Sequence, residues 1–182
     1  MSEEPAAKQQ KTGWEGYALN CNGLLMKADE GSHLAAFVDA PVTKLEGIGS
    51  VSEEVLQGLG CATIKDLAEY KFFLLARALV VLAETEETGK RDPNSAMNVD
   101  MAVDQEWEMK SLKEIVKAPI SALEGLTDKA NVAFKALGVT TIEELADFKY
   151  CKRAEAIVTA SKYEHTKTAQ ERKIEREMNK LK

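Results

Sequence analysis

The segment Gly47-Ile48-Gly49 has the residue types from which a phosphate-binding turn is built. Two glycines let a backbone approach an anion closely, and the amides at the start of a following helix then point toward it. Such a turn also needs nearby lysines or arginines, because neutralising phosphate charge dominates non-specific affinity for nucleic acid. The helix expected here begins SVSEEV and has no basic residue before Lys65. The sequence therefore favours a tight interhelical turn with Ile48 in the core over an anion contact.

Other side chains that could support catalysis or bind a metal are few and scattered. The two histidines, His33 and His165, lie in polar contexts, and neither HExxH nor a Cys/His zinc spacing is present. The Gly-Ile-Gly turn lacks the following Lys and Ser or Thr that a phosphate-binding loop requires. The carboxylates lie on expected helix surfaces or at helix starts, where they favour the helix dipole. We therefore expect no catalytic residues, no metal, no cofactor and no enzymatic activity.

Charge and cysteine content restrict the class of protein further. The 182 residues carry a formal net charge of −6 at pH 7, which suits a polyanionic partner poorly. Cys21, Cys61 and Cys151 are far apart, which favours inert thiols in a reducing compartment over a disulfide framework. The polar start MSEEPAAKQQ indicates neither a secretory signal nor a transit peptide, and no apolar run approaches the roughly 20 residues that span a bilayer. We expect an intracellular protein without a membrane span, in the cytoplasm ahead of the nucleus or an organelle stroma.

The strongest feature of the sequence is an internal repeat, which indicates the folded units that position the residues discussed above. Residues 34–84 align with residues 112–162 without a gap. A match of this length indicates tandem duplication of one folded unit. Identical pairs include Pro41/Pro119, Leu45/Leu123, Gly47/Gly125, Gly60/Gly138, Thr63/Thr141, Ile64/Ile142, Leu67/Leu145 and Lys71/Lys149.

Each unit is predicted to contain five short helices and no strand, so the fold class is all-α. Prolines separate the first two helices, glycines end the third, and the fifth has a long apolar stripe. Side chains expected to cap helix starts are Ser32, Ser50 with Glu53, Thr63 with Asp66, and Thr141 with Glu144. The predicted organisation is an N-terminal extension (1–31), a first unit (32–88), a linker (89–106), a second unit (107–162) and a charged C-terminal extension (163–182).

The pattern Leu-x-Gly-Ile-Gly, Leu-x-x-Leu-Gly and Thr-Ile-x-x-Leu-Ala resembles the helix-hairpin-helix superfamily. It is most similar to compact, SAM-like versions such as the amino-terminal domains of Rad51-like recombinases. The resemblance covers residues 34–84 and, less fully, 112–162. It implies a known fold but not one function: some members bind nucleic acid through the hairpin, and others are extrinsic subunits of large assemblies, including photosystem II.

The second hairpin, Gly125-Leu126-Thr127, departs from the family pattern, because threonine replaces the second glycine. The second unit is weakly basic, and Lys129 and Lys135 are the candidate phosphate contacts if the protein binds nucleic acid. One unit thus has the glycines without the charge, and the other has some charge without the glycines. We predict that both hairpins keep the backbone shape of the family but have lost the ability to bind phosphate.

The segments outside the units suggest where a partner could bind. Tyr17, Cys21, Leu24 and Leu25 lie on one stripe of a predicted amphipathic helix in the N-terminal extension. Trp14 and Trp107 are interpreted as buried anchors, with exposed partner-binding aromatics as the alternative.

Residues 148–182 contain neither glycine nor proline, so the last helix of the second unit is predicted to continue as one long rod. Ile174, Met178 and Leu181 form a thin apolar stripe on that rod, which is either a solvated helix or a docking helix. We predict a non-enzymatic protein–protein interaction adaptor or structural subunit, with the C-terminal helix and Trp14 as contact elements. The alternative is a nucleic-acid-binding or repair accessory protein.

Overall fold

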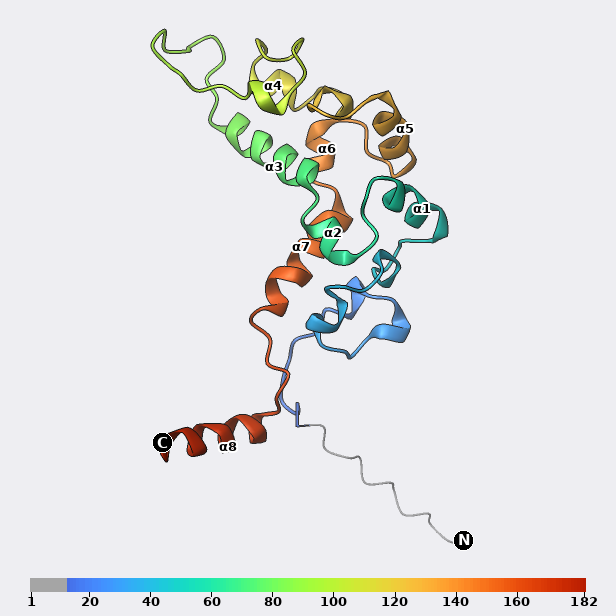
Figure 1. Ribbon diagram of the computed structural model, residues 1–182, viewed down its shortest axis with the longest axis vertical. Coiled ribbons are helices and arrows are strands. Elements are labelled where there is room, and N and C mark those ends of the chain that lie inside the picture. Colours follow the sequence, from blue (N-terminus) through green and yellow to red (C-terminus); the bar gives the residue numbers. More distant parts are fainter. Residues whose placement is uncertain (1–12) are drawn as a thin grey trace.

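The computed structural model describes residues 13–182, and these residues form a helical protein without a strand (Figure 1). Residues 1–12, which hold the polar start of the N-terminal extension, lie outside the described residues. Within the described part, extended backbone pairing is limited to four isolated bridges. The predicted all-α class is confirmed.

The helices and 3₁₀ turns (η) follow the same order twice, and we call residues 22–86 the first repeat and residues 100–164 the second repeat. The first repeat contains η1 (Asn22–Leu24), η3 (Leu34–Phe37), η4 (Val42–Lys44), α1 (Ser50–Gly58), α2 (Ile64–Ala68) and α3 (Lys71–Glu84). The second contains η5 (Asp100–Ala102), α4 (Leu112–Ile115), η6 (Ile120–Ala122), α5 (Asp128–Ala136), α6 (Ile142–Ala146) and α7 (Lys149–Ser161). Outside this series are η2 (Lys27–Asp29) and the final helix, α8 (Ala169–Lys180).

Residues close in sequence fix several of these helix ends. Thr63 starts α2 and Thr141 starts α6, each through the predicted capping box. Gly60 and Gly138 adopt φ values of +86° and +78°, as expected of glycines that end a helix. The capping box predicted at Ser50 is wrong, because Ser50 is already helical and the carbonyl of Gly49 accepts the hydrogen bond from Glu53. The cap predicted at Ser32 is also wrong, because η3 begins after His33 and no neighbouring side chain caps it.

The long helix that ends each repeat packs against the other repeat. Helix α3 contacts α4 and α6, whereas α7 contacts η3 and α2, and α1 contacts α5. Figure 1 shows α3 beside α4 and α6, and α7 beside α2. The contact faces are apolar and fully buried: Phe73, Ala76 and Leu79 on α3 align with Cys151, Ala154 and Ile157 on α7. Each long helix therefore completes a core whose other helices come from the other repeat.

The amphipathic helix predicted in the N-terminal extension is wrong. Residues 17–21 are not helical, and Tyr17 is exposed. Leu25 is buried in an extended bridge with Leu45, held by hydrogen bonds that pair Met26 with Lys44 and Glu46 with Leu24. Asn22 and Gly23 favour turns over helix. The backbone conformation of this segment is therefore set by its pairing with the residues around Leu45.

The single C-terminal rod is also wrong, because α7 ends at Ser161 and α8 begins only at Ala169. Glu164 leaves the helical path, and its carboxylate accepts hydrogen bonds from the amides of Leu34 and Ala35 at the start of η3. Thr168 and Glu171 then form a capping box that starts a new helix. Figure 1 shows α8 standing apart from the other helices.

Candidate protein-binding surface

Helix α8 is attached to the rest of the protein near its start. The side chain of Arg172 donates a hydrogen bond to the hydroxyl of Tyr17. Gly13 lies so close to α8 that a β-carbon added to it would be 2.7 Å from Cγ2 of Thr168. The N-terminal extension thus holds the first turn of α8, and the following turns extend away from the body (Figure 1).

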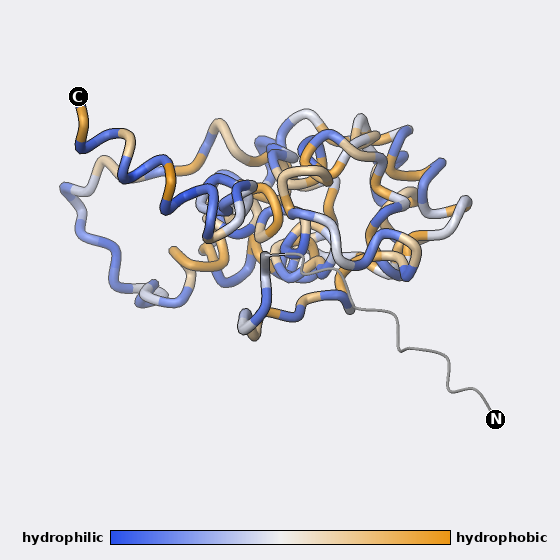
Figure 2. Tube along the Cα trace, turned by 90° about the horizontal axis from the view of Figure 1, so that it is seen from below, coloured by the Kyte–Doolittle hydropathy of each residue, from blue (hydrophilic) through white to orange (hydrophobic). Residues whose placement is uncertain are grey.

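The candidate surface is the apolar stripe of α8, formed by Ile174, Met178 and Leu181. Their spacing of four and three residues places them on one face of an α-helix. They are 57%, 58% and 84% exposed, respectively. Figure 2 shows the C-terminal helix as mostly hydrophilic, with hydrophobic positions spaced along it. The stripe does not line the hollow of about 380 Å³ between α8 and residues 164–167, which is lined by Glu164, His165, Thr166, Lys167, Arg172, Glu175, Arg176 and Asn179.

Trp14 and Trp107, the two tryptophans considered as partner contacts, are both half-buried. Trp14 packs edge-on against Tyr17 and His33, with ring centroids 5.7 Å and 5.3 Å away. Trp107 packs against the core and donates a hydrogen bond from Nε1 to the carboxylate of Glu106. Trp14 therefore supports the contact between Tyr17 and α8, whereas Trp107 packs on the core.

Glu164 links the second repeat to the first immediately before α8. Its carboxylate lies 3.0 Å from the amide nitrogens of Leu34 and Ala35 and 3.3 Å from Nδ1 of His33. Partial burial raises the pKa of Glu164, but hydrogen bonds from Ala35, Leu34 and His33 outweigh burial and hold the pKa below its usual range. The ionised carboxylate therefore stabilises the folded state.

This depressed pKa predicts a loss of stability in acid. The unfolded chain binds a proton at Glu164 at higher pH than the folded protein does, so the stabilisation is present above about pH 4.5 and is lost as pH falls further. We expect Glu164→Gln to lower the free energy of unfolding at pH 7 by about 0.5–2 kcal/mol. Urea unfolding from pH 3 to 7 should also show a shallower pH dependence for this variant than for the unmodified protein. An unchanged pH dependence would contradict this role for Glu164.

The first hairpin is covered by α7 of the second repeat. Gly47 has a φ of +94°, and its carbonyl accepts a hydrogen bond of 2.7 Å from the hydroxyl of Tyr150. The carbonyl of Glu46 accepts a second hydrogen bond, from Arg153. Ile48 is buried, and Gly49 immediately precedes α1. The turn is thus part of the packing between the repeats.

The second hairpin is placed in the same way against α3 of the first repeat. Gly125 has a φ of +90°, and a β-carbon added to it would lie 3.9 Å from Cζ of Phe72. Leu126 is half-buried, and Thr127 precedes α5 without capping it through its side chain. Phe72 therefore occupies the position that Tyr150 occupies over the first hairpin, without the hydroxyl.

This difference predicts unequal effects of alanine at the two hairpin glycines. Both Gly47→Ala and Gly125→Ala place a side chain at positive φ, which costs about 1–2 kcal/mol. Only at Gly47 would the new β-carbon also clash, with the hydroxyl of Tyr150 at 2.6 Å, because the 3.9 Å distance at Gly125 is an ordinary van der Waals contact. We expect chemical denaturation to show the larger loss for Gly47→Ala, by at least about 1 kcal/mol. Adding Tyr150→Phe should recover part of that difference, and equal losses at the two glycines would contradict the close packing.

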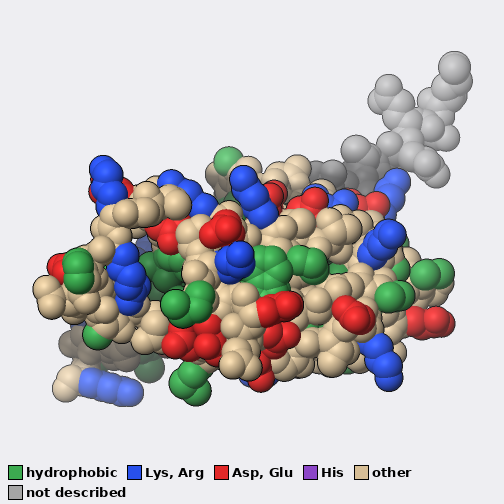
Figure 3. Space-filling view, turned by 90° about the horizontal axis from the view of Figure 1, so that it is seen from above, with side chains coloured by type: hydrophobic (Ala, Val, Ile, Leu, Met, Phe, Trp, Pro, Cys, Tyr) green, Lys and Arg blue, Asp and Glu red, His purple; other side chains and the backbone are tan. Residues whose placement is uncertain are grey.

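The candidate phosphate contacts, Lys129 and Lys135, lie on α5 and are exposed. Asp128 precedes them in the first turn of that helix. On the face drawn in Figure 3, Lys and Arg side chains are scattered among Asp and Glu side chains. The charges seen there do not form the single-sign surface on which phosphate binding depends.

Acidic side chains that line a hollow near α5 already have partners within the protein. One of about 630 Å³ lies at the end of α5 and is lined in part by Glu144, Asp147 and Phe148. Glu144 accepts hydrogen bonds from Thr140 and Asp147 pairs with Lys152 at 2.6 Å, so both carboxylates are engaged. Among residues 13–182, no group of three or more His, Cys, Asp or Glu side chains is arranged to hold a metal ion. No helix in the same range has both the length and the apolar character needed to cross a membrane.

Comparison of the chain with protein-family models, curated proteins and solved structures finds no match.

The cysteines differ in exposure. Cys61 and Cys151 are buried, and Cys21 is half-buried. Burial, with a smaller contribution from Asp66, raises the pKa of the Cys61 thiol to about 12. Burial and the neighbouring Cys61 likewise raise the pKa of Cys151. Because the thiolate is the reactive form, both buried thiols should be inert in the folded protein.

Thiol labelling tests this arrangement of the core. In the folded protein at pH 8 we expect iodoacetamide to modify Cys21 at least about a hundredfold faster than Cys61 or Cys151. In denaturant all three should react at similar rates. Peptide mass spectrometry after timed quenching gives the individual rates. Rapid labelling of Cys151 without denaturant would show that α7 does not pack stably on the first repeat.

Proposed function

We propose that this chain is a non-enzymatic adaptor or structural subunit that binds another protein through the apolar stripe of α8. The observation that supports this most is the exposure of Ile174, Met178 and Leu181 on a helix held near its first turn. Exposed apolar residues on one face of a helix are a common means of binding a partner. The aromatic cluster around Trp14 lies beside the start of α8, and we propose it as the second surface that contacts the partner.

The partner that suits α8 best is a protein with an apolar groove. The helix has 12 residues and three exposed apolar side chains, so two copies paired along it would bury far less than the roughly 1,200 Å² of a stable interface. A short helix is also marginally stable by itself in water. A groove would cover the stripe on several sides and order the helix at the same time.

We also infer that the two repeats are copies of one helix-hairpin-helix-like unit that arose by tandem duplication. The helices, bridges and caps that recur at equivalent positions support this inference. The position of each hairpin against a helix of the other repeat supports an internal role for the turn. Nucleic-acid binding is therefore the less favoured function, since the first hairpin carries no basic side chain and the second lacks its second glycine.

Purification of the tagged full-length chain from its native source, with and without nuclease, tests the proposed function. We expect a protein that copurifies in a fixed ratio and is retained after nuclease treatment. Copurification that is abolished by nuclease would contradict the adaptor function and favour the nucleic-acid alternative. In that alternative, binding to duplex or single-stranded DNA would weaken steeply with salt, and Lys129→Glu or Lys135→Glu would weaken it further.

A further inference from the structure

The contacts between the two repeats occur in reciprocal pairs, as in a symmetric dimer. Glu164 caps η3 of the first repeat through Leu34 and Ala35. At the equivalent positions, Glu86 caps α4 of the second repeat through Leu112 and Lys113, at 2.8 Å and 3.0 Å. Tyr150 over Gly47 and Phe72 over Gly125 form another reciprocal pair. Reciprocal contacts of this kind define an interface with a twofold relation between its two sides.

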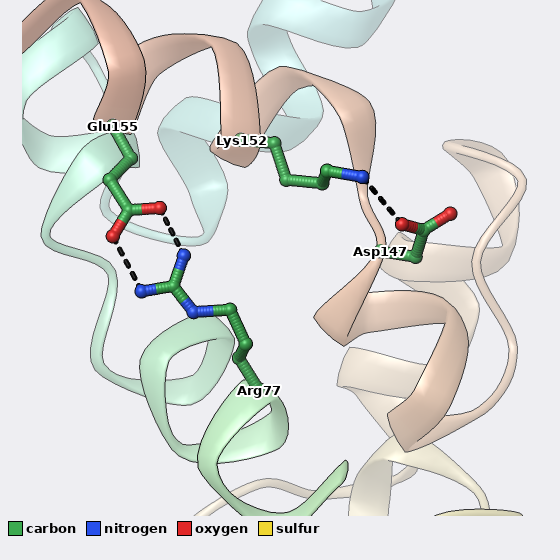
Figure 4. Close-up of polar contacts among 4 residues, drawn as sticks. All are labelled: Arg77, Asp147, Lys152 and Glu155. Atoms are coloured by element: carbon green, nitrogen blue, oxygen red, sulfur yellow. Dashed lines mark hydrogen bonds and ion pairs between the residues drawn. The ribbon is translucent and has the colours of Figure 1, made fainter. Parts of the chain in front are cut away.

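Two counterpart residues meet where this twofold relation requires a position to face itself. Arg77 of α3 and Glu155 of α7 are 78 positions apart, which is also the offset between the repeats. Figure 4 shows the guanidinium of Arg77 donating to both oxygens of Glu155. Their side chains are 41% and 30% exposed, so the pair is partly shielded from solvent. A residue can contact its own counterpart only at the symmetry axis.

We propose that this chain is a dimer contained in one polypeptide, in which each repeat offers a surface whose partner is the other repeat, and in which Arg77 and Glu155 select the pairing of unlike repeats. A pair of first repeats would place Arg77 against a second Arg77. A pair of second repeats would place two copies of Glu155 together. Only the unlike pair brings opposite charges into a bidentate contact.

The surface that each repeat offers is the part of its core that the long helix of the other repeat covers. Because α3 and α7 each pack on the other repeat, we call this arrangement the exchange of helices. In the first repeat, η3 and α2 carry the fully or nearly buried residues Phe37, Ile64 and Leu67, and α7 covers these elements. Without α7, this apolar surface would be in contact with water, as would the α4 and α6 surface without α3. Burial of apolar area at about 25 cal/mol per Å² drives the repeats together. The peptide link between them is therefore not needed for their association once they have folded.

Cleavage of the folded full-length protein tests the proposal. A recognition sequence for a specific protease is inserted between Gly89 and Lys90, in the exposed loop that follows Glu86. After complete cleavage we expect native mass spectrometry at micromolar concentration to show one N-terminal half bound to one C-terminal half. Separation of the halves under these conditions, or rearrangement into pairs of like halves, would overturn the proposal.

Charge variants of the cleavable protein test the selecting role of the ion pair. Arg77→Glu and Glu155→Arg should each raise the dissociation constant of the cleaved halves at least about tenfold, because each places like charges in contact. The double variant Arg77→Glu/Glu155→Arg restores opposite charges and should return the constant to within about threefold of the original. Circular dichroism before cleavage checks that each variant folds. The role assigned to Arg77 and Glu155 would be overturned if the halves of the double variant bound as weakly as those of the single variants. Equal dissociation constants for the original protein and all three variants would overturn it as well.

Discussion

Replacing Leu79 by alanine is expected to loosen the second repeat, although Leu79 belongs to the first. Leu79 is 1% exposed on α3, which packs against α4 and α6. Removing a buried leucine side chain costs about 2–5 kcal/mol, through lost burial and the cavity left behind. Hydrogen exchange should therefore show the largest loss of protection in α4 and α6.

The counterpart of Leu79 provides a matched control. Ile157 is also 1% exposed, and it lies on α7, which packs against η3 and α2. Ile157→Ala should cause a similar loss of stability, with the largest loss of protection in the first repeat. Two variants that each loosen their own repeat would contradict the exchange of helices. Two variants with identical, uniform exchange profiles would show that the repeats unfold only together.

Replacing the stripe of α8 by polar residues is expected to abolish partner binding and leave the fold intact. The variant Ile174→Gln/Met178→Gln/Leu181→Gln keeps good helix formers while it removes the apolar contact. If each of the three contributes about 1–2 kcal/mol to binding, affinity for the copurified partner should fall at least a hundredfold. The melting temperature should change by less than about 2 °C, because these side chains are exposed.

A second variant of α8 controls for general effects on this helix. Glu177 and Lys180 form an exposed ion pair with an oxygen–nitrogen distance of 2.9 Å. Glu177→Gln/Lys180→Gln leaves the net charge unchanged and should alter affinity by less than about threefold. Titration calorimetry or surface plasmon resonance with the purified partner measures both variants. Full affinity of the triple variant would exclude the stripe as the binding surface.

Features that depend on neighbouring residues could be predicted from the sequence. The glycines at positions 60 and 138 end helices because they can adopt positive φ. Thr63 and Thr141 start helices because an acidic residue follows three positions later. The all-α class follows from such signals and from the spacing of apolar residues.

The exchange of α3 and α7 could not be predicted, because an apolar stripe shows which face of a helix is buried but not which repeat covers it. The same limit applies to Tyr150 and Arg153, whose contacts with the first hairpin join residues more than a hundred positions apart. Two signals of other features were present in the sequence. The alignment of the repeats extends to Glu86 and Glu164, which identifies these two glutamates as counterparts. Thr168 with Glu171 has the spacing of a helix start and would have predicted the interruption between α7 and α8.

Nuclear Overhauser effects between methyl groups test the exchange of helices most directly. In the intact protein we predict cross-peaks from Leu75 and Leu79 of α3 to methyl groups of α4 and α6, which include Ile115, Ile142 and Leu145. Cross-peaks that instead connect the α3 methyl groups to those of η3 and α2 in the same repeat would contradict the account.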